Sequence, residues 1–370
     1  MLVDEFDAVN AAGGINGHKI DVKLMNDECK SDIGVANATK LSYQDKVHLL
    51  VGSSCSSVSM PIVDVIHKAR VPMLIPHSSS YKITLKGSPW VFRVPISSRF
   101  SAAAAAKYTA ENIGTKIAYI WASDTASQND ANKFSEYIKT YHGQDPVYAE
   151  QFQEGELDLR PHLLKIKALR PQALMVAAQS QDFARGLVQS YEVGIPRSVK
   201  RIGGSAASNR PAPILSGDAI KGVFFHAAFS YTDPHPRAKK FVKMTSARYG
   251  VSTPDHDFSQ AWDLAQIAKI ALKRSELTLT DSSLAVDRYV IRDALATVKG
   301  YQTLGGGIVD FCANPTPECR DGNKTPVLIE YISGGENYKL RVIGKTTFAA
   351  DFGLAGMKAE AKKLRDSLNN

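Results

Sequence analysis

The sequence predicts an α/β protein whose parallel sheets are covered by helices on both faces. Short, continuously apolar segments alternate with segments of helical spacing from residue 47 to residue 204, which is typical of this class. Polar loops follow the strand-like segments in two groups, one before residue 97 and one after residue 120. At 370 residues, the chain is also long enough for two domains. We therefore expect two doubly wound lobes that face each other across a cleft.

The first strand-and-loop unit joins an apolar segment to a serine-rich turn. Residues 47–51 (VHLLV) are too short and too apolar for a surface helix. Residues 53–57 read SSCSS, and helical spacing starts at Val58, so Ser57 is the predicted N-cap. Pro61 is expected in the first turn of this helix, where its missing N–H has no intrahelical partner.

The second unit repeats this arrangement with the apolar segment 71–75 and the loop 76–80 (PHSSS). Because parallel strands end at the same edge of a sheet, both loops are expected at the edge where open α/β sheets bind ligands. Hydroxyls and free N–H groups at a helix start favour an anion, and a carboxylate fits best. One such loop alone would more often be a helix cap, whereas two in successive units favour a binding half-site.

The start of the chain departs from the usual order of a parallel sheet. Residues 2–12 have the pattern of the last turns of a helix, and residues 20–26 are the next predicted strand. A parallel sheet normally opens with a strand before its first helix, and none is predicted here. We expect either a late start of the chain or a first strand upstream of the given sequence, and a lobe of low stability if that strand is absent.

The rest of the chain continues the alternation. Its polar loops at strand ends are residues 122–128, 179–182 and 203–205. The predicted helices are residues 35–43, 101–112, 130–141, 157–169, one that ends at Gly194, and 259–274. The predicted strands are residues 116–121, 147–152, 173–177, 201–202 and about 327–332. This strict alternation supports α/β architecture throughout.

Composition excludes several classes of protein. The net charge of +8 is modest for this length, and basic residues are scattered among acidic ones, so we expect no nucleic-acid partner. No apolar run approaches the ~20 residues of a membrane span, and the first residues lack the pattern of a signal peptide. The basic stretch 358–365 is the main exception, and we interpret it as an amphipathic helix that docks or stays solvated.

Four cysteines form an even set, Cys29, Cys55, Cys312 and Cys319, and no pair has the spacing of a zinc or redox motif. Cys29 and Cys55 each follow a predicted strand, which makes them plausible neighbours at one sheet edge. Cys312 and Cys319 flank a short loop that a disulfide would close. Two disulfides indicate an oxidising compartment, and the alternative is a set of buried thiols in a cytosolic protein.

An enzyme is the rival interpretation, but no nucleophile elbow, HExxH helix or phosphate-binding loop is present. Gly305, Gly306 and Gly307 precede Ile308 rather than a lysine, so we interpret them as a turn. His235 and His256 are better explained as exposed loop residues than as metal ligands. We therefore expect no enzymatic activity, no metal and no cofactor. A ligand-binding sensory domain or a ligand-responsive repressor is the third interpretation, because this fold class serves both.

Four segments together resemble the leucine/isoleucine/valine-binding protein family, the periplasmic solute-binding proteins of branched-chain amino acid type ABC transporters. They are residues 11–20 (AAGGINGHKI), 26–29 (NDEC), 52–57 (GSSCSS) and 72–78 (PMLIPHS). Weaker similarity continues at residues 260–265 and 292–295. The order and spacing of these segments carry the resemblance, since none of them is decisive alone.

The resemblance implies a type I periplasmic-binding fold, with two lobes that are joined by three crossovers and close on a ligand. The crossovers are expected near Ser97, Ala228 and Val309. This gives lobe one as residues 1–97 and 229–308, lobe two as residues 98–228 and 309–345, and a C-terminal helical tail at 346–370. It also supports a disulfide between Cys29 and Cys55. The implied setting is the periplasm, with a membrane permease as partner, and we expect a monomer.

Family positions also imply the ligand contacts. Ser56 or Ser57 would bind a ligand carboxylate, and Ser78 and Ser79 would add backbone and hydroxyl contacts. The contacts expected from lobe two are Ser127, Gln179 and Ser205.

One departure from the family bears on the ligand. Amino-acid binders of the family place an acid where this chain has Ser205, because a buried ammonium needs a partner. The neutral serine favours a carboxylate without an ammonium, such as an aromatic or keto acid, unless Asp124 or Asp182 replaces the acid.

Overall fold

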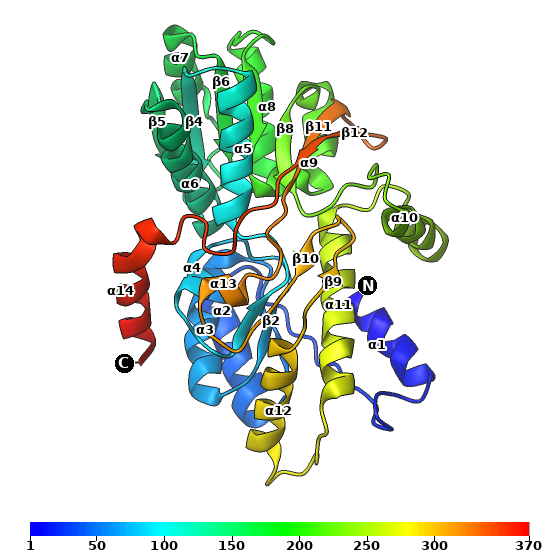
Figure 1. The fold of residues 1–370 in the computed structure, drawn as a ribbon. Coiled ribbons are helices and arrows are strands. Elements are labelled where there is room, and N and C mark those ends of the chain that lie inside the picture. Colours follow the sequence, from blue (N-terminus) through cyan, green and yellow to red (C-terminus); the bar gives the residue numbers. More distant parts are fainter. Residues whose placement is uncertain (370) are drawn as a thin grey trace. The chain divides into compact units, whose positions relative to one another are not determined.

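Two β-sheets, one in each of two units of the chain, form the framework of the protein (Figure 1). A computed structural model describes residues 1–369. Unit 1 comprises Met1–Ser97, Asp257–Lys324 and the segment from Phe348 onward, and unit 2 comprises Ser98–His256 and Thr325–Thr347. Each unit buries its own apolar core.

These bounds differ from the expected lobes in the second half of the chain. Residues 229–256 stay with unit 2, because Phe229 packs against Phe241 of helix α10 (Pro236–Tyr249), with ring centroids 5.6 Å apart. Residues 309–324 stay with unit 1, where Val309 is fully buried in the core. The expected separate tail belongs to unit 1 as well, since Leu368 packs into its core.

Unit 1 is built on a three-stranded parallel sheet in the order β1-β2-β3. The strands are β1 (Leu50–Val51), β2 (Met73–Ile75) and β3 (Val91–Arg93). Alternate side chains point to opposite faces, so Leu74 and Phe92 pack on α11 (His256–Arg274) and α12 (Leu284–Ala296), while Met73 and Ile75 pack on α3 (Ser56–Ala69). Both faces of the sheet are therefore covered by helices, as predicted.

The remaining elements of unit 1 are shorter. They are α1 (Leu2–Ala11), α2 (Ser31–Thr39) with a π-helical extension (Lys40–Gln44), α4 (Lys82–Leu85), β9 (Tyr301–Gln302), β10 (Ile308–Val309), α13 (Pro317–Arg320), a 3₁₀ turn (Ala355–Met357) and α14 (Lys358–Asn369). Strands β9 and β10 pair as an antiparallel hairpin.

Two strand predictions in unit 1 were wrong in extent or in kind. The expected strand over residues 20–26 is an irregular extended segment, and the expected strand over 47–51 is reduced to Leu50–Val51. A strand requires a hydrogen-bonded neighbour, and β1 pairs with β2 on one side only. The local sequence pattern of residues 20–26 was that of a strand, but among residues 1–369 no strand pairs with this segment.

Unit 2 contains a seven-stranded sheet in the order β12-β11-β8-β7-β6-β4-β5. Its strands are β4 (Ile117–Ala122), β5 (Tyr148–Phe152), β6 (Ala173–Ala177), β7 (Lys200–Gly203), β8 (Phe224–Ala227), β11 (Val327–Ser333) and β12 (Lys339–Lys345). The strands from β8 to β5 are parallel, whereas β11 and β12 are antiparallel to their neighbours. The sheet is thus mixed rather than wholly parallel as expected.

Helices cover both faces of this sheet. Tyr119 of β4 meets Phe134 of α6 on one face, at 5.4 Å between ring centroids, while Ala118 and Ile120 lie in the core that contains Phe183 of α8. The helical segments are α5 (Ser98–Asn112), α6 (Thr125–His142), α7 (Arg160–Leu169), α8 (Ser180–Glu192), a 3₁₀ turn (Ser205–Ser208), α9 (Pro211–Ser216), a second 3₁₀ turn (Gly217–Ile220) and α10. Among the described residues, no helix is both long and apolar enough to span a bilayer.

Candidate functional site

The serine-rich loop after β1 leads directly into helix α3. The helix begins at Ser56, two residues before the expected start, and Cys55 rather than Ser57 is its N-cap. A disulfide joins Cys55 to Cys29, with 5.6 Å between the Cα atoms, so the predicted pairing is confirmed. The second disulfide, Cys312 to Cys319, is present as well.

Pro61 lies slightly deeper in α3 than the sequence predicted. It is the sixth residue of the helix rather than part of its first turn, so it withholds a hydrogen bond from the carbonyl of Ser57. The hydroxyl of Ser31 donates to that carbonyl instead, at 2.9 Å. The start of α3 is thus stabilised from the neighbouring helix α2.

Several serine hydroxyls of unit 1 bind the loops to one another. The Ser78 hydroxyl donates to the carbonyl of Ser53 at 2.9 Å and lies 2.8 Å from the Ser59 hydroxyl. The Ser56 hydroxyl accepts from the main-chain N–H of Ser80 at 3.2 Å. Ser56 and Ser78, two of the predicted ligand contacts, therefore already have structural partners.

Ser57 and Ser79 are arranged differently. Within residues 1–369 their hydroxyls and N–H groups have no hydrogen-bond partner in the structure, and the N–H of Ser56 also lacks one. Ser79 is 9% exposed. These donors lie on loops that follow β1 and β2 in one sheet, as predicted, and a helix start adds a partial positive charge. The arrangement suits a carboxylate.

A buried arginine, which the sequence analysis missed, fixes the second serine loop. Arg93 of β3 is fully buried and donates to the carbonyls of Ser79 at 3.1 Å and Ser80 at 2.5 Å. Its Nε donates to Asp321 at 2.9 Å. Because the loop carbonyls point to Arg93, they do not compete with a bound anion. Only long-range pairing could have revealed this role.

In unit 2, Asp124 is the N-cap of helix α6. Its Oδ1 accepts from the N–H groups of Ala126 at 3.0 Å and Ser127 at 3.1 Å, and from the side chain of Gln179 at 3.1 Å. Ser127 and Gln179, both predicted contacts, thus share one carboxylate partner. The other oxygen, Oδ2, is buried and has no partner among the described residues.

The third predicted contact of unit 2, Ser205, lies over a buried acid. Its N–H donates to Oδ2 of Asp130 at 2.8 Å, and Asp130 is only 1% exposed. Burial raises the pKa of the Asp130 carboxyl to about 6, and the charge of Asp124 adds to the shift. Oδ1 of Asp130 has no hydrogen-bond partner among the described residues.

The sequence analysis did not select Asp130 because it placed this residue at the start of a helix. Helix α6 begins five residues earlier, at Thr125, and Asp130 is buried inside the helix rather than placed at its start. Asp182, one of the two acids expected to replace the family's missing acid, is already paired. It accepts from Arg185 at 2.5 Å and from the N–H of Gly155 at 2.7 Å.

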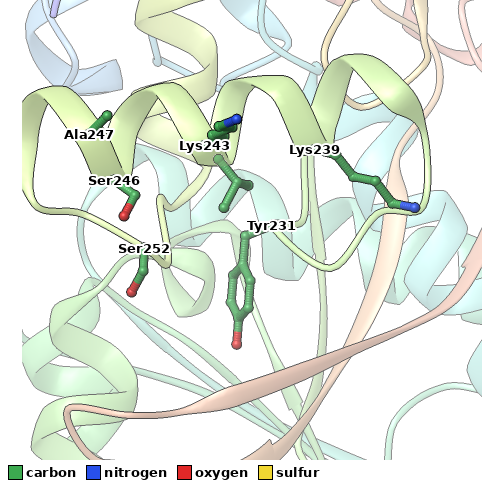
Figure 2. A pocket seen from close by; sticks show the side chains of 7 residues that line it. Tyr231, Lys239, Lys243, Ser246, Ala247 and Ser252 are labelled. Carbon is green, nitrogen blue, oxygen red and sulfur yellow. The ribbon is translucent and has the colours of Figure 1, made fainter.

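A separate hollow of about 520 Å³ lies beside helix α10 in unit 2. Figure 2 shows Lys239 and Lys243 on the helix and Tyr231 beside it. The Tyr231 hydroxyl donates to the carbonyl of Tyr338 at 2.8 Å. None of the predicted site residues lines this hollow, so we do not assign the ligand to it.

Comparison with curated proteins identifies relatives among amino-acid binders. The chain is 31% identical over 161 residues to the amino acid binding protein of Pseudomonas aeruginosa, and the match covers 43% of each protein. It is 22% identical over 318 residues to the Leu/Ile/Val-binding protein of Escherichia coli K12, which covers 83% of this chain and 84% of that protein. The matches to the first two curated relatives span 43% and 57% of their lengths.

Solved structures show the same fold. The leucine binding protein LivK of Thermotoga maritima superposes with a TM-score of 0.80 at 19% identity, covering 94% of this chain and 93% of that one. A solute binding protein of Rhodopseudomonas palustris in complex with 3,4-dihydroxybenzoic acid superposes with a TM-score of 0.78 at 20% identity, covering 94% and 92%. The predicted type I periplasmic-binding fold is therefore confirmed.

The family profile described as "Periplasmic binding protein" matches residues 3–319. Members of this family are binding proteins of ABC transporters rather than enzymes, which agrees with the lack of a catalytic motif in the sequence. Together with the fold, this match shows that the chain belongs to the periplasmic binding protein family.

Proposed function

We propose that this protein is the extracytoplasmic solute-binding component of an ABC importer and that it captures a small carboxylate ligand by hinge closure. The observation that carries the proposal is the set of unpartnered donors at Ser57 and Ser79, next to the start of α3. A carboxylate that accepts from these groups would replace the water lost on burial. A closed form stabilised only by ligand would then be the form that the permease recognises.

For the chemical class of the ligand, we favour an aromatic or keto acid over an amino acid. Ser205 is a neutral residue, and its N–H is already used by Asp130. The structural neighbour from Rhodopseudomonas palustris, which holds 3,4-dihydroxybenzoic acid, supports the idea that this fold accommodates a carboxylate without an ammonium.

A branched-chain or other amino acid is the second candidate, and a specific observation favours it. Asp124 Oδ2 and Asp130 Oδ1 are buried carboxylate oxygens without partners among the described residues. Unpaired buried carboxylates are costly, and a ligand ammonium would offset that cost. The relatives from Pseudomonas aeruginosa and Escherichia coli carry amino-acid binding in their names.

The proposed setting is the periplasm, where the protein would act as a monomer and deliver its ligand to a membrane permease. Two disulfides in the structure support an oxidising compartment. A sensory ligand-binding domain of the same fold is the alternative role. If deletion of the gene for this protein abolishes ligand uptake and the restored gene recovers it, the transport role is supported. If uptake is unchanged but ligand-dependent gene expression is altered, the sensory role is supported.

The ligand class can be tested with matched probes. Leucine, its keto analogue 4-methyl-2-oxopentanoate and 3,4-dihydroxybenzoate all carry a carboxylate, but only leucine carries an ammonium. A ligand at about a hundred times its Kd adds ~2.7 kcal/mol of stability, which a thermal-shift assay detects. Stabilisation by the two acids without an ammonium would support the first candidate. Stabilisation by leucine alone would favour the second, and no response to any carboxylate would contradict the proposal.

A further inference from the structure

Helix α10 of unit 2 carries basic side chains without any acidic ones. Its 14 residues include no aspartate or glutamate, and its basic residues are Arg237, Lys239, Lys240, Lys243 and Arg248. On helix α6, by contrast, Lys133 pairs with Glu136 of the same helix at 2.7 Å. Helix α10 thus has no acid of its own that could neutralise its lysines.

Three lysines of α10 have no partner elsewhere in unit 2 either. Lys239, Lys240 and Lys243 are exposed, and in the part of the chain that the structure describes none of their ammonium groups makes an ion pair or a hydrogen bond. Asp233, the acid that precedes the helix, is buried and paired with Lys345. Lys239 and Lys243 stand one turn apart on one side of the helix, where like charges repel. An anionic partner would relieve this repulsion.

A concave surface adjoins these lysines. The hollow of about 520 Å³ has Lys239 and Lys243 on its helical wall, and Tyr231 lies beside the helix as part of the same lining (Figure 2). The Tyr231 ring is held in place because its hydroxyl donates to the carbonyl of Tyr338 at 2.8 Å. Val242 adds further apolar surface. The hollow is therefore preformed, with positive charge along one rim and an apolar lining.

This combination selects the class of occupant. A lipid surface is flat and would leave the hollow empty. The apolar side of α10 is also not available to a bilayer, because Phe241 is buried and packs against Phe229. A single small anion would contact the rim but leave the apolar lining uncovered. A polypeptide segment that carries both acidic and apolar side chains matches the whole surface.

The spacing of the lysines fits an extended segment. Lys239 and Lys243 are four residues apart, which is a rise of about 6 Å along the helix axis. Alternate side chains of an extended polypeptide lie on one side of the chain, about 7 Å apart. Acids at two alternate positions therefore match the two lysines, and the side chain between them points the opposite way.

We propose that the hollow beside α10 docks an acidic, extended segment of another protein. Two acids of the segment pair with Lys239 and Lys243, and the apolar side chain between them covers Tyr231 and Val242. The complementary charge selects the partner and speeds its association, while the apolar side chain acts as the anchor. None of the predicted ligand contacts lines the hollow, so the proposal does not depend on the carboxylate ligand.

The probe is a labelled pentapeptide with one leucine between two pairs of glutamates. Two control peptides carry the same label: one has glutamines in place of the glutamates, and the other has alanine in place of the leucine. We expect saturable binding of the probe by fluorescence anisotropy, with a Kd below about 1 mM at low salt, and about tenfold weaker binding of each control. Equal binding of the probe and the glutamine peptide, or no saturable binding of the probe, would overturn the proposal.

Protein variants locate the site. Lys239→Glu with Lys243→Glu should weaken binding of the probe at least tenfold. Lys358→Glu with Lys363→Glu is the matched control, because it makes the same change in net charge at exposed positions of α14 and should leave the affinity unchanged. Ala247→Phe fills the hollow without changing the charge and should reduce the affinity for the probe to that of the alanine peptide. Equal affinity in the two double variants would overturn the assignment.

The same α10 double variant separates the other possible occupants. Vesicles with equal parts of phosphatidylglycerol and phosphatidylcholine should bind the natural protein no better than this variant. Sedimentation should show the same oligomeric state for both proteins. Vesicle binding that the variant loses would assign the surface to a membrane, and self-association that the variant loses would assign it to a second copy. Either result would overturn the proposal.

Discussion

The main-chain N–H of Ser205 donates to Oδ2 of Asp130 at 2.8 Å, and this bond joins a predicted ligand contact to the most buried acid near it. The family resemblance implies an acid at the position of Ser205 in amino-acid binders, and here an acid lies next to that position. Its second oxygen has no partner among the described residues. Under the proposed function, this pair sets the charge that unit 2 presents to the ligand.

Asp130→Asn should change how stability depends on pH. Burial raises the pKa of Asp130 to about 6, so in the natural protein the free energy of unfolding falls as pH rises from about 4 to about 6, by up to ~3 kcal/mol. Asparagine keeps an acceptor for Ser205 and does not ionise, so the variant should lose this dependence. Urea unfolding from pH 4 to pH 8 measures it. Asp218→Asn, at an exposed site, is the control, and a matching pH profile in both variants would contradict the assignment.

Proton release on ligand binding should separate the two ligand classes. A ligand ammonium near Asp130 would lower the pKa of its carboxyl, so an amino acid binding at pH 6 would release up to about half a proton. A carboxylate without an ammonium would release none. Calorimetry in two buffers with different ionisation enthalpies measures the difference. Proton release from the natural protein that persists in Asp130→Asn would show that another group titrates.

The serines of unit 1 should divide into ligand donors and structural residues. Ser57→Ala or Ser79→Ala removes a hydroxyl without a partner, so each should weaken ligand binding about tenfold and leave stability nearly unchanged. Ser56→Ala or Ser78→Ala removes a hydroxyl that connects two loops, so each should lower the free energy of unfolding by ~1–2 kcal/mol. Titration calorimetry and urea unfolding on the four variants test this division. Equal loss of affinity in all four would mean that the loop network, not the free donors, sets binding.

Much of the fold was predicted from the sequence, because a segment with the pattern of a strand forms a strand wherever a neighbouring strand pairs with it. Strand β6 has the bounds predicted from residues 173–177, since a central strand with neighbours on both sides keeps its full length. Residues 20–26 have a similar pattern, but no strand within the described chain pairs with them, and they remain an irregular extended segment. The local sequence pattern does not show which distant segments pair with one another.

The candidate site was predictable to a similar degree. The serine-rich loops follow strands β1 and β2 as predicted, and both expected cysteine pairs form disulfides. Asp130 was missed because the sequence pattern placed it at the start of a helix, whereas it lies buried within α6. Arg93 was missed because its role depends on Asp321, 228 residues away. Whether the serines contact a ligand remains a prediction.

Replacing Arg93 should affect both stability and binding. The side chains of Arg93 and Asp321 are 0% and 1% exposed, and loss of one partner leaves an uncompensated buried charge. Arg93→Met should therefore cost about 3–5 kcal/mol, and it would also release the loop carbonyls of Ser79 and Ser80. The double variant Arg93→Met with Asp321→Leu should recover part of the stability but not the affinity. Recovery of both would show that Arg93 does not position the loop.

Loss of the Cys29–Cys55 disulfide should weaken ligand binding as well as stability. The bond closes a loop of 26 residues, against seven for Cys312–Cys319, and chain entropy predicts about 3.5 against about 2.3 kcal/mol of stabilisation. Cys55 is also the N-cap of α3, so Cys29→Ser with Cys55→Ser frees the residue that precedes the donors at Ser56 and Ser57. Cys312→Ser with Cys319→Ser is the matched control, because it removes a disulfide without touching α3. Titration calorimetry well below the unfolding midpoint measures affinity, and urea unfolding measures stability; equal affinity in the two double variants would contradict the role of Cys55.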